Sequence, residues 1–137
     1  MRYWIVKSEP HAWSWDQQVQ KGVEPWNGVR NYQAANNMKA MRLGDRAFFY
    51  HSGEERAIVG IVEIVKEYYP DHTDESGRFG MVDVKTVGPV KTPVTLAAIK
   101  ADERLKDLAL VRQSRLSVVP VDAAQAKILC QMAGIKG

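Results

Sequence analysis

The sequence predicts a single α+β domain with a mixed, mainly antiparallel and barrel-like β-sheet that is flanked by helices. Its 137 residues match the usual length of one domain. The composition, with 45% hydrophobic and 26% charged residues, is that of an ordinary globular chain. Strand and helix patterns do not alternate strictly, which argues against a parallel α/β fold. Because no repeat or long linker divides the chain, we expect one domain over residues 1–137.

The first half of the chain predicts two strands and two helices. Residues 3–7 carry alternating bulky and β-branched side chains, which favour a strand. Ser14 opens a capping-box pattern for a short helix that Gly22 would end. Apolar side chains recur at i, i+3 spacing over residues 31–41 and predict a second helix, followed by a strand over 47–51.

The second half predicts two long strands, a helical region, a short strand and a final helix. These lie over residues 57–68 and 79–87, over 95–101 with a continuation at 105–110, over 116–119, and over 122–134. Both long strands are rich in Val and Ile with a period of two. Asp122 repeats the capping-box pattern, and Gly134 can terminate the last helix. The polar residues 71–78 are expected to form an exposed loop.

Several classes of protein are excluded or disfavoured by what the sequence contains. A single cysteine, Cys130, excludes an intramolecular disulfide framework and a multi-cysteine zinc site. The three histidines, His11, His51 and His72, lack metal-ligand spacing, and no P-loop, GxGxxG or GxSxG motif occurs. We therefore expect no catalytic constellation, metal or cofactor. No apolar run approaches the roughly 20 residues that cross a bilayer, so we expect no membrane partner and a cytoplasmic location.

The tryptophans are concentrated in one part of the chain. All four, Trp4, Trp13, Trp15 and Trp26, lie within the first 26 residues. Clustered tryptophans form either core or a stacking surface, because each indole N–H needs a partner when buried. Trp4 falls in a predicted strand and is expected in the core. Trp26 precedes the turn signal Asn27-Gly28 and is a candidate for ligand contact, with core packing as the alternative.

Positive charge gathers late in the chain, within a formal net charge of +3. Between residues 104 and 115, four basic residues stand against one acidic residue, Asp107. The basic residues are Arg104, Lys106, Arg112 and Arg115. This stretch suits a phosphate-bearing ligand, and an ordinary solvated surface is the alternative.

Colinear blocks covering nearly the whole chain resemble the EVE domain. They are YWIVKSEP, WSWDQ, WNGVRNYQAANNM, MRLGDRAFFYHS, IVGIVEIVKEYYPD and LVRQSRLSVVPV. The resemblance implies a PUA-like fold, a small mixed β-barrel flanked by helices, in a superfamily that includes the YTH and ASCH domains. It also implies a non-enzymatic module that binds DNA or RNA through a flipped, modified base, with modified cytosine in DNA as one proposed ligand. We expect such a module to be monomeric.

Residue by residue, the resemblance implies an aromatic base-binding pocket with cations around it. The base-binding residues would be Ser8, Trp26, Asn31, Tyr50, His51, Ser52 and Ser117. The phosphate or backbone contacts would be Lys7, Arg30 and Arg115, together with Arg112 of the basic stretch. Ser8, Asn31 and Ser117 would bond the edge of the base. The ring opposite Trp26 stays open between Trp13, Trp15 and Tyr32.

Two other functions remain open at this point. Some ASCH relatives hydrolyse modified nucleosides with a Lys, a Thr and a Glu, and Lys7, Ser8 and either Glu9 or Glu63 could form a similar trio. In the other alternative the protein is an interaction module whose tryptophans are all core.

Overall fold

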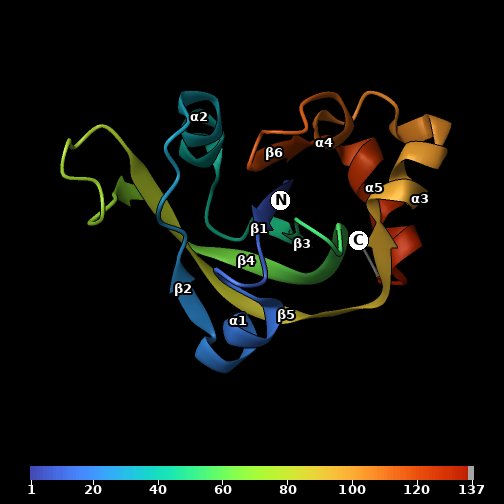
Figure 1. Ribbon diagram of the computed structural model, residues 1–137, viewed down its shortest axis with the longest axis horizontal. Coiled ribbons are helices and arrows are strands. Elements are labelled where there is room, and N and C mark those ends of the chain that lie inside the picture. The colour runs from blue at the N-terminus through green and yellow to red at the C-terminus, as the bar shows by residue number, and fades with distance from the viewer. Residues whose placement is uncertain (136–137) are drawn as a thin grey trace.

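A computed structural model describes residues 1–135 as a six-stranded sheet with the order β2-β5-β4-β3-β1-β6 (Figure 1). The strands are β1 (Tyr3–Ser8), β2 (Val23–Pro25), β3 (Arg46–His51), β4 (Ala57–Pro70), β5 (Gly80–Thr95) and β6 (Val118–Val121). Only the β1–β3 pair is parallel, and the other four pairs are antiparallel. The α+β class and the mainly antiparallel sheet are therefore confirmed.

The sheet remains open, so the expected closure into a barrel is not found. The edge strands β2 and β6 are only three and four residues long, and each pairs with one neighbour, β5 or β1. Register shifts interrupt the β4–β5 pairing at four places and the β3–β4 pairing once. Such irregularities bend strands and increase their twist. The sheet therefore curves around the core without its edges meeting.

Five α-helices surround the sheet within the described residues. They are α1 (Trp15–Lys21), α2 (Tyr32–Ala40), α3 (Leu96–Ala101), α4 (Ala109–Arg112) and α5 (Ala123–Ala133). Figure 1 shows α1 and α2 on opposite sides of the curved sheet, whereas α3, α4 and α5 gather beside β6 and the end of β5. None of these helices is long and apolar enough to cross a membrane.

Local sequence signals set most helix boundaries. Both predicted capping boxes form, at Ser14 before α1 and at Asp122 before α5. Gly134 ends α5 in the left-handed conformation that glycine favours, with φ 72°. The predicted continuation over 105–110 is a 3₁₀ turn, Glu103–Leu105, followed by the short helix α4.

The parallel pairing of β1 with β3 has a topological consequence. Two parallel neighbours cannot be joined by a hairpin, so the chain between them must cross over. Residues 9–45 make this crossover and contain α1, β2 and α2. β2 escapes sequence prediction because its three residues are defined only by pairing with β5, as in Glu24 opposite Val84.

The core confirms that Trp4 is buried and shows how its polar atom is satisfied. Trp4 is 1% exposed, and its indole N–H donates to Asp45 Oδ2 at 3.1 Å. The backbone N–H groups of Arg2 and Arg42 donate to the same carboxylate, at 3.0 Å each. Burial alone would raise the pKa of Asp45, but these hydrogen bonds outweigh it and lower that pKa. The start of β1 is thereby fixed to the turn before β3.

Trp15 is also core, and it sets a steric requirement on β4. Its ring packs edge-on against Phe49, with centroids 5.2 Å apart, and lies directly over Gly60. A Cβ at Gly60 would overlap three atoms of the Trp15 ring.

We predict that Gly60→Ala destabilises the protein, because the added methyl group forces Trp15 out of its packed position. Overpacking of this kind typically costs about 1–3 kcal/mol. Urea unfolding followed by far-ultraviolet circular dichroism measures the change. Gly88→Ala in β5 is the matched control, since a Cβ there meets nothing within 4 Å. Equal stability of the two variants would contradict the packing described for Trp15.

Candidate nucleic-acid interface

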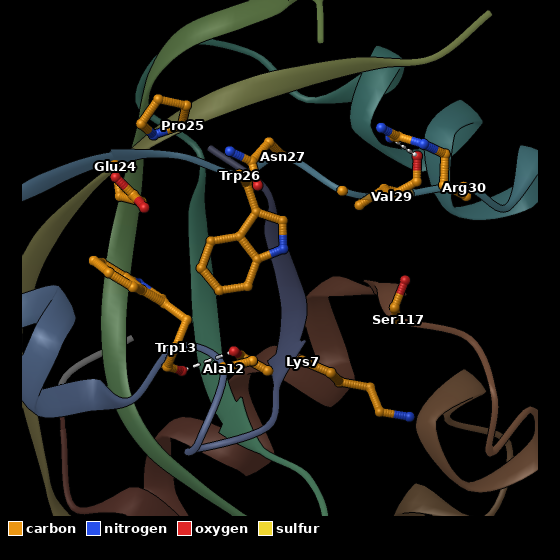
Figure 2. A pocket seen from close by; sticks show the side chains of 12 residues that line it. Lys7, Ala12, Trp13, Glu24, Pro25, Trp26, Asn27, Val29, Arg30 and Ser117 are labelled. Atoms are coloured by element: carbon orange, nitrogen blue, oxygen red, sulfur yellow. Dashed lines mark hydrogen bonds between the residues drawn. The ribbon is translucent and has the colours of Figure 1, made fainter. Parts of the chain in front are cut away.

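A cavity of about 340 Å³ opens at the C-terminal end of β1 (Figure 2). The walls come from residues 7–8 of β1, residues 12–13 before α1, residues 24–30 of β2 and the following loop, and Ser117 before β6. Most of this lining therefore belongs to the crossover between β1 and β3. The cavity contains indole rings, hydroxyl groups and charged groups of both signs.

Two tryptophans line the cavity, and each is fixed by contacts with neighbouring residues. Trp26 is 7% exposed and stands edge-on against Phe49, with centroids 5.6 Å apart and an interplanar angle of 86°. Its backbone N–H donates to the carbonyl of Val82 at 2.7 Å, which continues the β2–β5 pairing. Trp13 is half-buried, and its indole N–H donates to Gln18 Oε1 at 2.9 Å.

The structure places Trp13 beside Trp26, rather than either of the other two aromatic candidates. Trp15 is 9% exposed and belongs to the core. Tyr32 is 61% exposed and packs against Phe79, with ring centroids 4.9 Å apart and an interplanar angle of 35°. Neither of these two rings lines the cavity.

Ser8, Ser117 and Lys7 bring polar atoms to the cavity from the strand side. Ser8 Oγ donates to the backbone carbonyl of Trp13 at 2.7 Å, which leaves its lone pairs for a ligand. Lys7 Nζ donates to the carbonyl of Ser114 at 2.8 Å. Burial lowers the pKa of Lys7. An ammonium group has three donors, so Lys7 can hold Ser114 and still bind an anion or a carbonyl.

The lining of the cavity does not include Tyr50, His51 and Ser52. His51 Nε2 accepts a hydrogen bond from the backbone N–H of Trp15 at 2.9 Å, and its Nδ1 lies 3.0 Å from Glu55 Oε2. This pattern assigns the imidazole proton to Nδ1. Tyr50 is 2% exposed, and Ser52 donates its N–H to the carbonyl of Ser8 at 3.0 Å. The three residues position β1 and the start of α1.

A second, polar concavity of about 330 Å³ contains the remaining predicted residues Asn31, Arg112 and Arg115. Asn31 caps α2, with its Oδ1 accepting the N–H of Ala34 at 2.9 Å. Arg112 pairs with Asp107 at 2.9 Å on the exposed surface. The two concavities are neighbours, because Ser114 lines the second one and accepts the hydrogen bond of Lys7 from the first.

Asp71 fixes the loop that follows Trp26, a role that the sequence analysis missed. The carboxylate accepts from the backbone N–H of Gly28 at 2.8 Å and from the Arg30 guanidinium at 3.1 Å. Arg30 also donates to Thr73 Oγ1 at 2.9 Å, so its charge is already shared with this loop. Asp71 is 3% exposed, in contrast to the exposed position expected for residues 71–78.

The pKa of Asp71 reflects this arrangement. Burial alone raises it, but hydrogen bonds from Thr73, Gly28 and Arg30 outweigh burial and lower the pKa to about 2. The charged carboxylate is therefore the stable form at neutral pH, and it stabilises the loop.

Glu24 is a second residue that the sequence analysis missed. Its side chain is 18% exposed, lines the cavity, and pairs with Lys21 Nζ at 2.8 Å. The sequence offered only the spacing, because Glu24 stands two positions before Trp26, and the structure brings both side chains to the cavity.

The glutamates of the possible hydrolase trio do not line the cavity. Glu9 pairs with His11 on the exposed surface at 3.0 Å. Glu63 pairs in register with Arg46, which itself lies opposite Tyr3 at the other end of β1 from Lys7. The trio is therefore not assembled around Lys7.

Comparison with known proteins identifies the family. The sequence model of the EVE-domain family matches residues 2–132 of this chain. The chain belongs to the EVE-domain family. This EVE domain is 37% identical to thymocyte nuclear protein 1 of Gallus gallus, over 87% of this chain and 63% of that protein. It therefore spans a little under two-thirds of the length of that relative.

Two solved structures share this EVE fold closely. A solution structure of a protein from Rhodopseudomonas palustris has 60% sequence identity, covers 98% of this chain and 94% of its own, and has a TM-score of 0.92. A crystal structure of the human THYN1 protein in complex with DNA containing 5-methylcytosine has 32% identity, 100% coverage of both chains and a TM-score of 0.92.

We predict that Asp71→Asn destabilises the EVE domain at neutral pH by about 2 kcal/mol, the equivalent of a pKa lowered from 3.8 to about 2. Because the folded-state pKa lies below the unfolded one, the contribution is present above about pH 4 and is lost as the pH falls through about 2. The stability difference between wild type and variant should narrow over this range in urea unfolding.

Glu75→Gln is the control for Asp71→Asn, since Glu75 is an exposed carboxylate in the same loop. It should leave the stability unchanged within about 0.5 kcal/mol. A stability difference between wild type and Asp71→Asn that stays constant from pH 7 to pH 2 would show that the charge of Asp71 does not anchor the loop.

Proposed function

We propose that this EVE domain is a non-enzymatic DNA-binding module that takes a flipped, modified base, with 5-methylcytosine as the first candidate, into the cavity beside Trp26. The observation that carries the proposal is the open cavity that Trp13 and Trp26 both line, together with polar groups. Membership in the family of the human THYN1 protein, which was crystallised with 5-methylcytosine DNA, supports the choice of ligand.

The size and chemistry of the cavity support a single base as the ligand. A volume of about 340 Å³ lies at the lower end of the range for ligand pockets and suits one small planar group. Stacking on an aromatic ring contributes about 1–3 kcal/mol per base, whereas unstacking the base costs a few kcal/mol. The net gain is small, so one domain should bind DNA in roughly the micromolar range.

A 5-methyl group would meet an apolar part of the lining. Ala12, Pro25 and Val29 contribute such surface. Burial of one methyl group is worth about 0.8 kcal/mol, which corresponds to roughly a fourfold preference over unmethylated cytosine. A larger preference would require a penalty on the unmodified base, such as water that stays trapped beside it.

Around the cavity, basic side chains would hold the DNA backbone. Lys7 and Arg30 line the cavity itself, and Arg112 and Arg115 line the second, polar concavity. Phosphate contacts position a nucleic acid without reading its sequence. The strand that leaves the cavity would therefore run over the neighbouring polar concavity.

Trp13→Ala should weaken binding of 5-methylcytosine DNA by about 5- to 100-fold while the protein stays folded, because it removes one stacking ring. Trp13 is chosen because Trp26 is part of the core. Trp13→Phe should retain most of the affinity. Titration of tryptophan fluorescence with a duplex that carries one 5-methylcytosine, or cytosine at the same place, measures both affinities. Absent or equal binding of these duplexes by the wild type would overturn the proposed function.

Arg115→Ala should weaken binding of methylated and unmethylated DNA by the same factor. The slope of log affinity against log salt concentration should fall by about 1, as expected for one lost phosphate contact. Arg104→Ala is the control, because Arg104 pairs with Asp102 and lines neither concavity. A selective loss of the methylated duplex would instead place Arg115 at the base.

A further inference from the structure

Glu24 presents a hydrogen-bond acceptor to the cavity. It lies in β2, two residues before Trp26, and the side chains of both residues line the cavity. One carboxylate oxygen, Oε1, lies 2.8 Å from Lys21 Nζ. Among the hydrogen bonds of residues 1–135, none involves the second oxygen, Oε2. The ion pair restrains the side chain and leaves acceptor capacity for a ligand.

The charged and polar groups of the cavity are separated in space. Figure 2 shows Glu24 on one side of the Trp26 indole, with Lys7 and Ser117 on the other. A carboxylate can only accept hydrogen bonds, an ammonium can only donate them, and a hydroxyl can donate. The cavity therefore offers an acceptor at one side and donors at the opposite side.

We propose that Glu24 accepts a hydrogen bond from the exocyclic amino group of a bound cytosine, so that the cavity selects 5-methylcytosine against thymine. The inference rests on the proposed function. Cytosine carries its amino group and its O2 carbonyl at opposite ends of the pairing edge, which matches Glu24 on one side and Lys7 or Ser117 on the other. Acidic side chains accept from this amino group in DNA recognition generally.

Thymine tests this arrangement, because it shares the pyrimidine skeleton and the methyl group of 5-methylcytosine but differs along the pairing edge. Its C4 carries a carbonyl instead of an amino group, and its N3 carries a hydrogen. In the same pose two acceptors, the thymine O4 and the Glu24 carboxylate, would face each other without a proton between them. A buried acceptor left without its partner loses the hydrogen bond and retains the full cost of desolvation.

The experiment compares wild type and Glu24→Gln on duplexes with a central 5-methylcytosine or thymine. Each base stands opposite an abasic site, so neither has a pairing partner to lose on flipping. Wild type should bind the 5-methylcytosine duplex about tenfold or more tightly than the thymine duplex. The carboxamide of Gln can donate to O4, so the ratio should fall to within about threefold in Glu24→Gln.

Two control variants separate the effect of the hydrogen bond between Glu24 and the base from the effect of changing the charge of the protein. Lys21→Ala removes the ion pair but keeps the carboxylate, so the ratio between the two bases should persist even where both affinities change. Glu9→Gln removes a carboxylate that also pairs with a basic side chain, His11, but lies outside the cavity. It should leave the ratio unchanged.

A change in the ligand provides a test that does not depend on folding of a variant. A duplex with 5-methyl-2-pyrimidinone lacks the amino group altogether and should bind wild type about tenfold more weakly than the 5-methylcytosine duplex. In Glu24→Gln the loss should be smaller, because the two changes remove the same contact.

The outcomes distinguish this inference from the function on which it rests. Equal affinity of wild type for 5-methylcytosine and thymine, or an unchanged ratio in Glu24→Gln, overturns the role of Glu24 and leaves the proposed function in place. Failure of wild type to bind any of the duplexes overturns both.

Discussion

The shape of the cavity depends on the buried carboxylate of Asp71. The loop after Trp26 has little secondary structure of its own, so its position must come from contacts elsewhere in the chain. Asp71 supplies them through the backbone N–H of Gly28 and the guanidinium of Arg30. One wall is thus held by charge and hydrogen bonds, whereas the indole of Trp26 is held by packing against Phe49. A preorganised cavity avoids part of the entropy cost of ordering its walls around a ligand.

Features that depend on neighbouring residues could be predicted from the sequence. The capping boxes at Ser14 and Asp122 need only a partner three residues away, and both form. Alternating apolar residues likewise indicated the strands other than β2. Features that depend on distant partners could not be predicted. The carboxylate of Asp71 meets Gly28 from 43 positions away, and β2 is defined by its pairing with β5.

The residues of the candidate site likewise divide into those that the sequence predicted and those that it did not. Family resemblance and local motifs pointed to Ser8, Trp26 and Ser117, and the structure brings these three into one cavity. His51 does not line that cavity, and its Nε2 instead accepts a hydrogen bond from the backbone N–H of Trp15. Glu24 was overlooked because strand β2 was overlooked, and with it the pairing with β5 that brings residues 24–26 to the cavity.

The crossover between β1 and β3 has a consequence for how such a protein can diversify. Most of the lining of the cavity is carried by this crossover, whereas most of the sheet is built from residues outside it. Substitutions, insertions or deletions in this stretch can remodel the ligand preference while the strand pairings of the scaffold persist. Proteins with this fold can therefore evolve different ligand specificities, and exchange of this stretch between relatives is a direct route to new ones.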